Sequence, residues 1–498
     1  MYYHLYKPLR NRLRRYALRP CLHQLWFIFQ HIRNGKDCPY PMRSLRGRVQ
    51  PWEISLLVRE LVLNAGDHGR TFRQYDDFAD AINGVKALGE KIHKQVITPQ
   101  TVMDEASAIA HQQAPWFEHS AHVGLLRYWR LLRTPDVARI LERMLGVDVR
   151  KVFQIGMVGG GELMGLPYVD TRRNFADIRI APEEVARFYA PIITTVDGLR
   201  ERLQSAQRYD RNWAYTWNAL EATPLIQLDS AFPHRFTAPV PELQLRAFAQ
   251  GVYYALVNDA EFGNAFGKAF ETYVGDALHE IFPGPMYRVQ AETPYQVGRN
   301  QKHGADWIVS DRTGHLFFEC KTKRVRLEAK MAGDVAAVEG QLDAMAKFVV
   351  QLYKNIRDAE GGLTAWRPDR LPIYPVVLTL EDWHLFAPWM VAKLNALIVA
   401  GLQKAAIPEA VLQEMPYTIT SVDDFFGGAL VASATGIESF FRPKTQPAYA
   451  TWMLRPYANQ FYPELVRQTH KLLFWDDLKD ILPYAELFGV PATDEDTM

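Results

Sequence analysis

The stretch HLFFECKTKR, residues 315–324, ends an apolar run on two charged residues, Glu319 and Lys321, with Cys320 between them. Charges of this kind are costly to bury unless they are paired or bound to something. A further acid, Asp306, lies at the start of the preceding strand-like run, ADWIVS. Two carboxylates beside an ammonium group have the chemistry to hold a hard divalent cation and to hydrolyse a phosphodiester. The sequence therefore predicts a metal-dependent site at this strand end.

Alternation along a strand predicts which of these side chains meet. Glu319 and Lys321 share one face of the strand, whereas Cys320 shares the other with Leu316 and Phe318. The thiol of Cys320 is therefore expected in the core, as a small hydrophobic group rather than a metal ligand. Magnesium also prefers oxygen to sulfur.

A tight hairpin is expected to bring the two strands together. Residues 311–314, Asp-Arg-Thr-Gly, have the composition of such a turn and would place Asp306 beside the end of the next strand. The same acid-x-lysine spacing recurs at residues 328–330 and 477–479. Neither of these ends an apolar strand or follows an acid on a neighbouring strand, so the context favours the first.

The elements that position the site follow from periodicity and turn signals. Apolar residues at helical spacing predict a helix over about residues 262–282, which ends at Pro-Gly-Pro, and another over about 335–356. The runs MYRVQAETPYQV, ADWIVS and HLFFEC lie between these helices, and YPVVLTL follows them. Helix, three strands, helix, strand predicts an α/β core with a mixed central sheet flanked by helices.

Asp306, Glu319 and Lys321 resemble the D…(D/E)-x-K signature of the PD-(D/E)xK, or restriction-endonuclease-like, nuclease superfamily. The common core of that superfamily is helix, three strands, helix, strand, which is the order predicted above. One departure is that Gly304-Ala305 stands where a proline usually precedes the aspartate. The resemblance covers about residues 260 to 385.

Two further residues match the same family. Glu271, in GKAFETYVGDAL, resembles the glutamate that many members carry on the first core helix in a G-x-x-F-E-x-x-V setting. Gly267 and Gly275 lie one turn to either side, which leaves room for close approach to the sheet. Gln341, in EGQLDAMAKF, opens the second helix, where members often place a glutamine or lysine near the metal.

The resemblance implies a nuclease that depends on Mg²⁺ or Mn²⁺. Asp306, Glu319 and the backbone carbonyl of Cys320 would be the metal ligands, with Glu271 as a further one. Lys321 would position the attacking water or neutralise developing charge. DNA is the expected substrate because most relatives cut DNA. Two alternatives stay open, namely an RNA-cleaving nuclease and a non-catalytic nucleic-acid-binding protein on the same fold.

The amino-terminal half differs in character. A chain of 498 residues is expected to form more than one domain. Helical patterns predict a mostly α-helical module over residues 1–235, and the proline-rich segment FPHRFTAPVPE, residues 232–242, suggests the boundary. Residues 236–498 would then form the nuclease-like domain with a carboxy-terminal helical extension.

The predicted amino-terminal module is expected to have a sensing, binding or regulatory role. Its expected partner is another protein or a second copy of the chain. A large unfamiliar module fused to such a nuclease is similar in build to bacterial antiphage-defence and restriction effectors, which is an analogy at the level of domains.

The composition of the chain limits the class of protein and the compartment in which it is expected. The three cysteines, Cys21, Cys38 and Cys320, form no C-x-x-C pair, which argues against a disulfide framework or zinc ribbon. No run reaches the roughly 18 to 20 apolar residues of a membrane span. The first residues are basic but lack the apolar core and cleavage site of a signal peptide, so a cytoplasmic protein is expected. The formal net charge of +1 does not by itself indicate a nucleic-acid binder.

Several local patterns have both a functional and a structural interpretation. The basic start of the chain could meet phosphates or form a solvated helix face, and the three basic residues after Lys321 could do the same in a loop. The aromatic and basic residues of 116–133 could stack unpaired bases, although their helical spacing favours the core. Residues 156–165, GMVGGGELMG, lack the P-loop ending and are expected to form a flexible turn. His111, His119 and His122 are expected to be surface residues of a helix rather than metal ligands.

Overall fold

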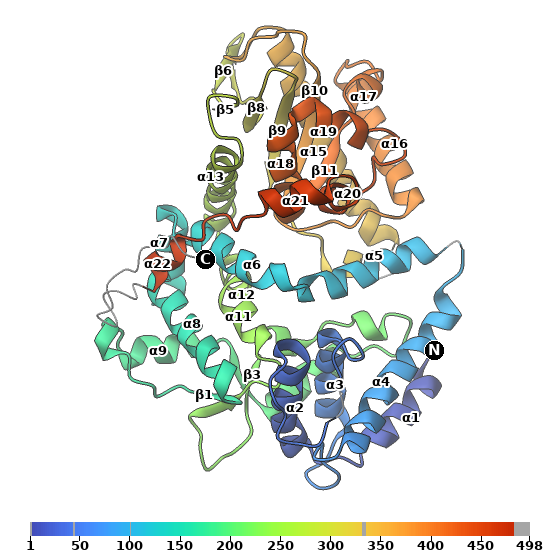
Figure 1. Ribbon diagram of the computed structural model, residues 1–498, viewed down its shortest axis with the longest axis vertical. Coiled ribbons are helices and arrows are strands. Elements are labelled where there is room, and N and C mark those ends of the chain that lie inside the picture. The colour runs from blue at the N-terminus through green and yellow to red at the C-terminus, as the bar shows by residue number, and fades with distance from the viewer. Residues whose placement is uncertain (1, 43–44, 100, 331–334, 483–498) are drawn as a thin grey trace. The chain divides into compact units, whose positions relative to one another are not determined.

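The computed structural model describes residues 2–42, 45–99, 101–330 and 335–482 (Figure 1). It is a mixed α/β protein with a helical amino-terminal region, in agreement with the fold class predicted at that level. The chain divides into two compact units. Unit 1 comprises Met1–Thr101, Gln112–Gly263 and Phe474–Met498, and unit 2 comprises Val102–His111 and Asn264–Leu473.

Unit 1 is built mainly from helices around an apolar core. Apolar side chains from α1 to α4 and from α10 pack together there, among them Leu22, Ile54, Leu57, Phe78 and Leu199. The helices are α1 (Tyr3–Leu13), α2 (Leu18–Asn34), α3 (Pro51–Asn64), α4 (Tyr75–Val96), α6 (Glu118–Leu132), α7 (Pro135–Leu145), α8 (Val149–Gly165), α9 (Pro182–Tyr189), α10 (Val196–Ala206), α11 (Glu242–Phe248), α12 (Gln250–Leu256) and α22 (Asp477–Ile481).

A small four-stranded sheet in the order β1-β4-β3-β2 completes unit 1. Its strands are β1 (Tyr168–Asp170), β2 (Ile193–Thr195), β3 (Leu225–Gln227) and β4 (Arg235–Thr237). The proline-rich segment 232–242 contributes β4 to this sheet, and α11 after it packs Leu243 into the core of unit 1. The two units therefore divide after Gly263 rather than within the segment expected to be the boundary.

The glycine-rich run 156–165 lies inside helix α8, so the expectation of a flexible turn was wrong. The glycines permit close packing instead. A Cβ atom on Gly156 would lie 2.5 Å from the ring of Phe248, and one on Gly160 would lie 2.7 Å from Leu245. Glycine is a poor helix former, but contacts with neighbouring elements outweigh that weak preference here.

The end of the described chain returns to unit 1. Arg130 of α6 binds Asp477 of α22 through two nitrogen–oxygen contacts of 2.6 and 2.9 Å. Gln154 donates a 3.0 Å hydrogen bond to the carbonyl of Ile481, which is fully buried. Residues 474–482 therefore belong to unit 1 rather than to the extension of the nuclease-like domain expected from the sequence.

Unit 2 is organised around a mixed five-stranded sheet in the order β11-β10-β9-β8-β5 (Figure 1). Pairing is antiparallel from β5 through β8 to β9, and parallel from β9 through β10 to β11. The strands are β5 (Arg288–Ala291), β8 (Trp307–Ser310), β9 (His315–Lys321), β10 (Ile373–Thr379) and β11 (Thr418–Ser421). A separate hairpin consists of β6 (Tyr295–Val297) and β7 (Asn300–Lys302).

Helices cover both faces of this sheet. On one face, Phe317 and Val377 pack with apolar residues of α15 (Val335–Glu360) and α16 (Pro388–Lys404). On the other, Phe318 contacts Phe425 of α18 (Val422–Thr435), with ring centroids 5.1 Å apart. Helix α13 (Phe262–Ile281) lies on that second side, because Tyr273 contacts Phe426 of α18.

The remaining helices of unit 2 are short or peripheral. They are α14 (Leu327–Lys330), α17 (Val411–Glu414), α19 (Ile437–Lys444), α20 (Leu454–Phe461) and α21 (Pro463–Thr469). Helix α5 (Val102–Gln113) contributes Val102–His111 to this unit, where Ser107 donates a 2.7 Å hydrogen bond to the carbonyl of His384.

The order of elements in unit 2 agrees with the sequence prediction in part. Helix α13, strands β5, β8 and β9, helix α15 and strand β10 follow one another as helix, three strands, helix, strand. The hairpin β6–β7 and the edge strand β11 were not predicted. The run MYRVQAETPYQV contributes to two strands, β5 and β6, that belong to different sheets.

Candidate active site

The hairpin between β8 and β9 positions the first predicted residue, Asp306. Asp311 and Gly314 close a two-residue turn, with the Asp311 amide donating to the Gly314 carbonyl at 3.1 Å. Register then pairs Trp307 with Phe318. The Asp306 amide also donates to the Phe318 carbonyl, at 3.0 Å. Two residues of one strand therefore face one residue of the other, which is the arrangement of a β-bulge, a feature that often re-aims a side chain near a functional site.

The bulge turns the Asp306 carboxylate toward β9. Its Oδ2 accepts a hydrogen bond from the Cys320 backbone amide at 2.6 Å. The prediction that Asp306 lies beside the end of the next strand is therefore confirmed, although a bulge rather than plain pairing brings it there.

Glu319 is buried, with 4% of its surface exposed, and it has two side-chain partners. The ammonium of Lys321 lies 2.6 Å from its Oε1, and the Nδ2 of Asn355 donates to its Oε2 at 3.3 Å. Lys321 also lies over the ring of Phe348, with Nζ 5.4 Å from the centroid. Glu319 and Lys321 thus share one face of β9 as alternation predicts.

Burial and mutual repulsion raise the pKa values of the two carboxyl groups. Burial, followed by the charge of Asp306, raises the pKa of Glu319 to about 7 despite the opposing effect of Lys321. Burial also raises the pKa of Asp306, although the Cys320 amide and Lys321 favour its charged form. Burial lowers the pKa of Lys321, but Glu319 and Asp306 raise it by more. Raised carboxyl pKa values beside a bound lysine are typical of functional sites.

Glu271 of α13 belongs to the same electrostatic group. Burial, followed by the charge of Asp306, raises the pKa of Glu271 to about 7, and Glu271 in turn raises that of Glu319. The backbone carbonyl of Glu271 accepts a 2.9 Å hydrogen bond from the indole nitrogen of Trp307. Gly275 permits this contact, because a Cβ atom there would lie 1.9 Å from the Trp307 ring. The expected close approach of this helix to the sheet thus occurs at Gly275, whereas Gly267 faces open space.

Gln341 lies near the start of α15, as expected, and is buried. Its Oε1 has no hydrogen-bond partner among the described residues. None of the hydrogen bonds in the described part of the chain joins it to Asp306 or Glu319, and Phe348 of the same helix is the residue beneath Lys321. Seven residues separate Gln341 from Phe348, which is about 10 Å along a helix.

Two residues near the carboxylates were missed from the sequence. Asn355 contacts Glu319 and also donates to the Gly304 carbonyl at 2.8 Å, and it interrupts the apolar stripe of α15 as a buried polar residue. Glu292 follows β5, donates its amide to the Asp306 carbonyl at 2.9 Å, and has a charge that raises the pKa of Asp306. Glu292 lies within the run MYRVQAETPYQV, and an acid in the middle of that strand-like run was the signal for it.

Cys320 is placed as predicted, with its side chain in the core. It is 4% exposed, and burial together with the nearby carboxylates raises the pKa of its thiol well above the ordinary value. The thiol therefore stays protonated, which does not suit a thiolate ligand.

The donor set fits a hard divalent cation. Asp306 and Glu319 offer carboxylate oxygens at one buried point, and their mutual repulsion is the kind of cost that a bound cation relieves. Glu271 interacts electrostatically with both of these acids. In the described residues, no group of three or more histidine, cysteine or acidic side chains already has the arrangement of a metal cluster.

The three basic residues after Lys321 do not form a single exposed group that could bind phosphate. Arg324 turns inward and lies 3.4 Å from the carboxylate of Glu381, with 7% of its side chain exposed. Lys323 and Arg326 are exposed. Phosphate contact therefore stays a prediction for these two residues alone.

The aromatic residues of segment 116–133 lie in the core. Trp116, Tyr128 and Trp129 are 5%, 1% and 4% exposed, so they are not a stacking surface for bases. Arg130 and Arg133 contact Asp477 and Asp480 of α22, so their charges are already paired. Arg127 is buried, at 7% exposed.

The two remaining local patterns are the basic start of the chain and the histidines at positions 111, 119 and 122. The basic start of the chain, with Lys7, Arg10, Arg12, Arg14, Arg15 and Arg19, overlaps the packed helix α1. Arg12 of α1 and Arg15, just after this helix, each lie 3.4 Å from Asp80. His111 contacts His384 edge-on, with ring centroids 4.6 Å apart. The side chains of His119 and His122 lie outside the described part.

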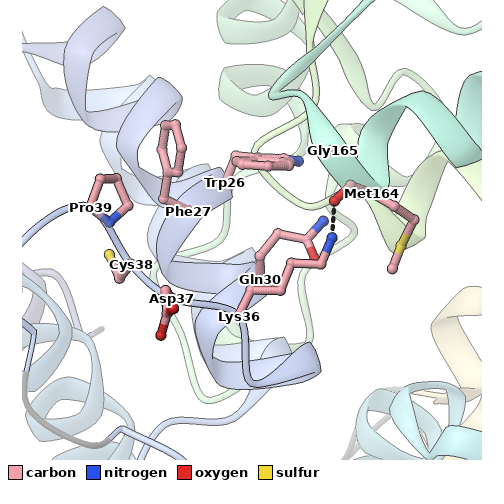
Figure 2. Close-up of a pocket in the computed structure, with 9 residues that line it drawn as sticks. All are labelled: Trp26, Phe27, Gln30, Lys36, Asp37, Cys38, Pro39, Met164 and Gly165. Atoms are coloured by element: carbon pink, nitrogen blue, oxygen red, sulfur yellow. Dashed lines mark hydrogen bonds between the residues drawn. The ribbon is translucent and has the colours of Figure 1, made fainter.

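A pocket of about 420 Å³ lies in unit 1, and none of the residues that line it is a predicted site residue (Figure 2). Three of its polar side chains donate hydrogen bonds to backbone carbonyls of α8. Trp26 and Gln30 donate to the Leu163 carbonyl at 2.9 and 2.8 Å, and Lys36 donates to the Met164 carbonyl. These side chains satisfy carbonyls at the end of α8 that the helix itself leaves unpaired. Trp26, Gln30 and Lys36 therefore cap the carboxy-terminal end of α8, and this role explains their place in the pocket wall.

None of the helices in the described ranges combines the length and apolar character that a membrane span requires. No protein-family model matches the chain, and no curated protein or solved structure to which it was compared does so either.

Proposed function

We propose that the protein is a metal-dependent nuclease that hydrolyses phosphodiester bonds, and that unit 2 is a core of the PD-(D/E)xK type. The main support is the convergence of Asp306, Glu319 and Lys321 at one buried point. Like charges in that position are costly unless they bind something, and binding a cation is the use that their chemistry suits.

Each residue then has a role. Asp306 and Glu319 would hold Mg²⁺ or Mn²⁺, with the Cys320 carbonyl and Glu271 as further oxygen donors. A cation bound there supplies a water of lowered pKa and stabilises negative charge on the phosphoryl group. Lys321 carries the positive charge nearest to Glu319, so it is assigned to orient the attacking water or to neutralise developing charge.

Nucleic acid is the proposed substrate, with DNA favoured over RNA by the resemblance. A role as an effector of antiphage defence or restriction in the cytoplasm, with unit 1 as the sensing or partner-binding part, belongs to the same proposal and rests on the analogy of domain organisation.

The test is to incubate the purified full-length protein with supercoiled DNA, linear duplex, single-stranded DNA and RNA, with Mn²⁺ or with a chelator. Cleavage of at least one substrate with Mn²⁺ and none with chelator is expected. Binding without cleavage of any of the four would favour a non-catalytic protein on this fold.

Lys321→Ala separates chemistry from binding. Because Lys321 is assigned to the transition state, cleavage should fall by a factor on the order of 10² while nucleic-acid affinity stays close to that of the wild type. A parallel loss of affinity would reduce Lys321 to a phosphate anchor.

A further inference from the structure

The hairpin β6–β7 ends shortly before Asp306 in the chain. Val297 pairs with Asn300, which leaves Gly298 and Arg299 as a two-residue turn. Gly298 has a φ of +63°, a conformation that glycine adopts at little cost. Arg299 therefore lies at the tip of the hairpin.

This hairpin is largely exposed, and its turn carries Arg299, whereas Lys302 lies 2.9 Å from Asp358 and His303 lies 2.7 Å from Glu292. The segment from residue 293 to 303, TPYQVGRNQKH, contains no acid, and residues 298–301 are all exposed. It forms a two-stranded sheet of its own, separate from the five-stranded sheet. A two-stranded hairpin has little stability alone, so its position must be fixed by contacts with the rest of unit 2.

Asp358 of α15 supplies those contacts. Its Oδ2 accepts a 2.7 Å hydrogen bond from the hydroxyl of Tyr295 and lies 2.9 Å from the ammonium of Lys302. Tyr295 and Asp358 are 8% and 6% exposed. One buried carboxylate thus holds both strands of the hairpin through hydrogen bonds that its charge strengthens.

The same helix holds the carboxylate pair. Asn355, three residues before Asp358 and therefore on the same side of α15, donates to the Gly304 carbonyl and to Glu319. Gly304 lies between the hairpin and Asp306. Helix α15 therefore fixes the hairpin, the segment that follows it and Glu319 to one support.

A nucleic-acid strand that binds near these carboxylates needs positive charge from the protein, because its own phosphates are negative. Glu271, Glu292, Asp306 and Glu319 place four carboxyl groups in one electrostatically linked set, which becomes more negative as the acids ionise. That charge repels a polyanion at distances comparable to the Debye length. A basic residue on an element that shares the support of α15 with Glu319 would offset this repulsion. The planar guanidinium of arginine also matches phosphate geometry.

We propose that the β6–β7 hairpin is the substrate-binding arm of unit 2, and that Arg299 contacts the phosphate backbone of the nucleic acid to be cut. The proposal rests on the proposed nuclease function and adds to it the element that holds the substrate.

The experiment measures the affinity of full-length protein for a fluorescein-labelled DNA duplex, DNA strand and RNA strand over a range of salt concentrations. Every protein carries Lys321→Ala so that substrate is not consumed. Arg299→Ala is compared with its parent, with Arg299→Lys, and with the control Arg312→Ala. Arg312 is an exposed arginine in the two-residue turn between β8 and β9. This turn precedes the first residue of β9, whereas Glu319 lies near the last residue of that strand.

Loss of one phosphate contact should flatten the slope of log affinity against log salt by about 1 for Arg299→Ala. Arg299→Lys, which keeps the charge, and Arg312→Ala should keep the parent slope. An unchanged slope for Arg299→Ala, or an equal change for Arg312→Ala, would overturn the proposal.

Failure of the arm and failure of the nuclease function give different results. Metal-dependent cleavage by the wild type with an unchanged Arg299→Ala slope overturns the arm alone. A flattened slope without cleavage by the wild type supports the arm and overturns the nuclease function.

Discussion

At the scale of single residues, the two buried carboxylates are stabilised by different partners. Asp306 receives a backbone amide, whereas Glu319 receives the ammonium of Lys321 and the amide of Asn355. These partners do not offset burial, since the pKa values of both acids are raised. When both carboxylates are ionised, one lysine beside them leaves a net negative charge, and a divalent cation would neutralise that charge.

This excess charge predicts a pH dependence of stability in the metal-free protein. Glu319 and Glu271 each have a pKa near 7 when folded against an ordinary value of 4.5, so the folded state holds more protons between these limits. The free energy of unfolding should therefore fall as the pH rises through this window, and one pKa unit corresponds to about 1.4 kcal/mol.

Glu319→Gln removes one titrating group, so chemical unfolding of the variant should show a shallower fall than the wild type between about pH 5 and pH 8. Glu328→Gln, at an exposed acid with the same spacing to a lysine, is the control and should keep the wild-type slope. Parallel curves for Glu319→Gln and the wild type would show that Glu319 is not the group that titrates in this window.

Cys320 gives a second prediction at this scale. Because its side chain lies in the core and only its backbone adjoins Asp306, Cys320→Ala should keep metal-dependent cleavage near the wild-type rate. The loss of stability should be about 1 to 2 kcal/mol, measured by chemical unfolding. A stable but inactive Cys320→Ala would mean that the faces of β9 have been assigned the wrong way round.

The placement of Asp306, Glu319 and Lys321 near one another could be predicted because strand alternation and a short hairpin are local features. Asn355 could not, since it lies 36 residues from Glu319 and meets it only through the rotation of α15 against the sheet. Gln341 and Asn355 are fourteen residues apart, close to a whole number of helical turns, so periodicity places both on one stripe and does not say which one reaches the acid.

At the scale of elements, the approach of α13 to the sheet depends on one glycine. A methyl group at Gly275 would meet the Trp307 ring at 1.9 Å, and the Trp307 indole donates a hydrogen bond to the Glu271 carbonyl. Gly275→Ala should therefore destabilise the protein by about 1 to 3 kcal/mol or more through overpacking, measured by chemical unfolding.

Gly267 of the same helix provides the matched control. A Cβ atom added at Gly267 would have no neighbour within 4 Å among the described residues. Gly267→Ala should therefore be neutral or raise the free energy of unfolding by about 0.5 to 1 kcal/mol. Similar effects of the two substitutions would mean that helix propensity, rather than contact with Trp307, governs Gly275.

The elements themselves were predictable to the extent that local pattern decides them. Apolar periodicity located α13 and α15, because each buries one stripe against the sheet or against another helix. It failed for the glycine run of α8, where the helix is favoured by partners distant in the chain such as Phe248. Local composition does not contain such partners.

At the scale of the whole molecule, the division into units follows from contacts distant in sequence. Composition suggested a boundary in the proline-rich segment 232–242, but that segment pairs in the small sheet of unit 1. Residues 474–482 belong to unit 1 through Asp477 and Ile481, and α5 contributes to unit 2 through Ser107. None of these associations has a local sequence signal.

The proposal of a nuclease depends on the carboxylates of unit 2 acting with a cation on nucleic acid. The measurement that tests it most directly is Mn²⁺-dependent cleavage of DNA and RNA by the wild type, Glu319→Gln and the control Glu328→Gln, with folding checked by circular dichroism. Cleavage by the wild type and Glu328→Gln, and a loss of cleavage for folded Glu319→Gln by a factor on the order of 10² or more, is the expected result. Equal cleavage by Glu319→Gln and the wild type would contradict the account.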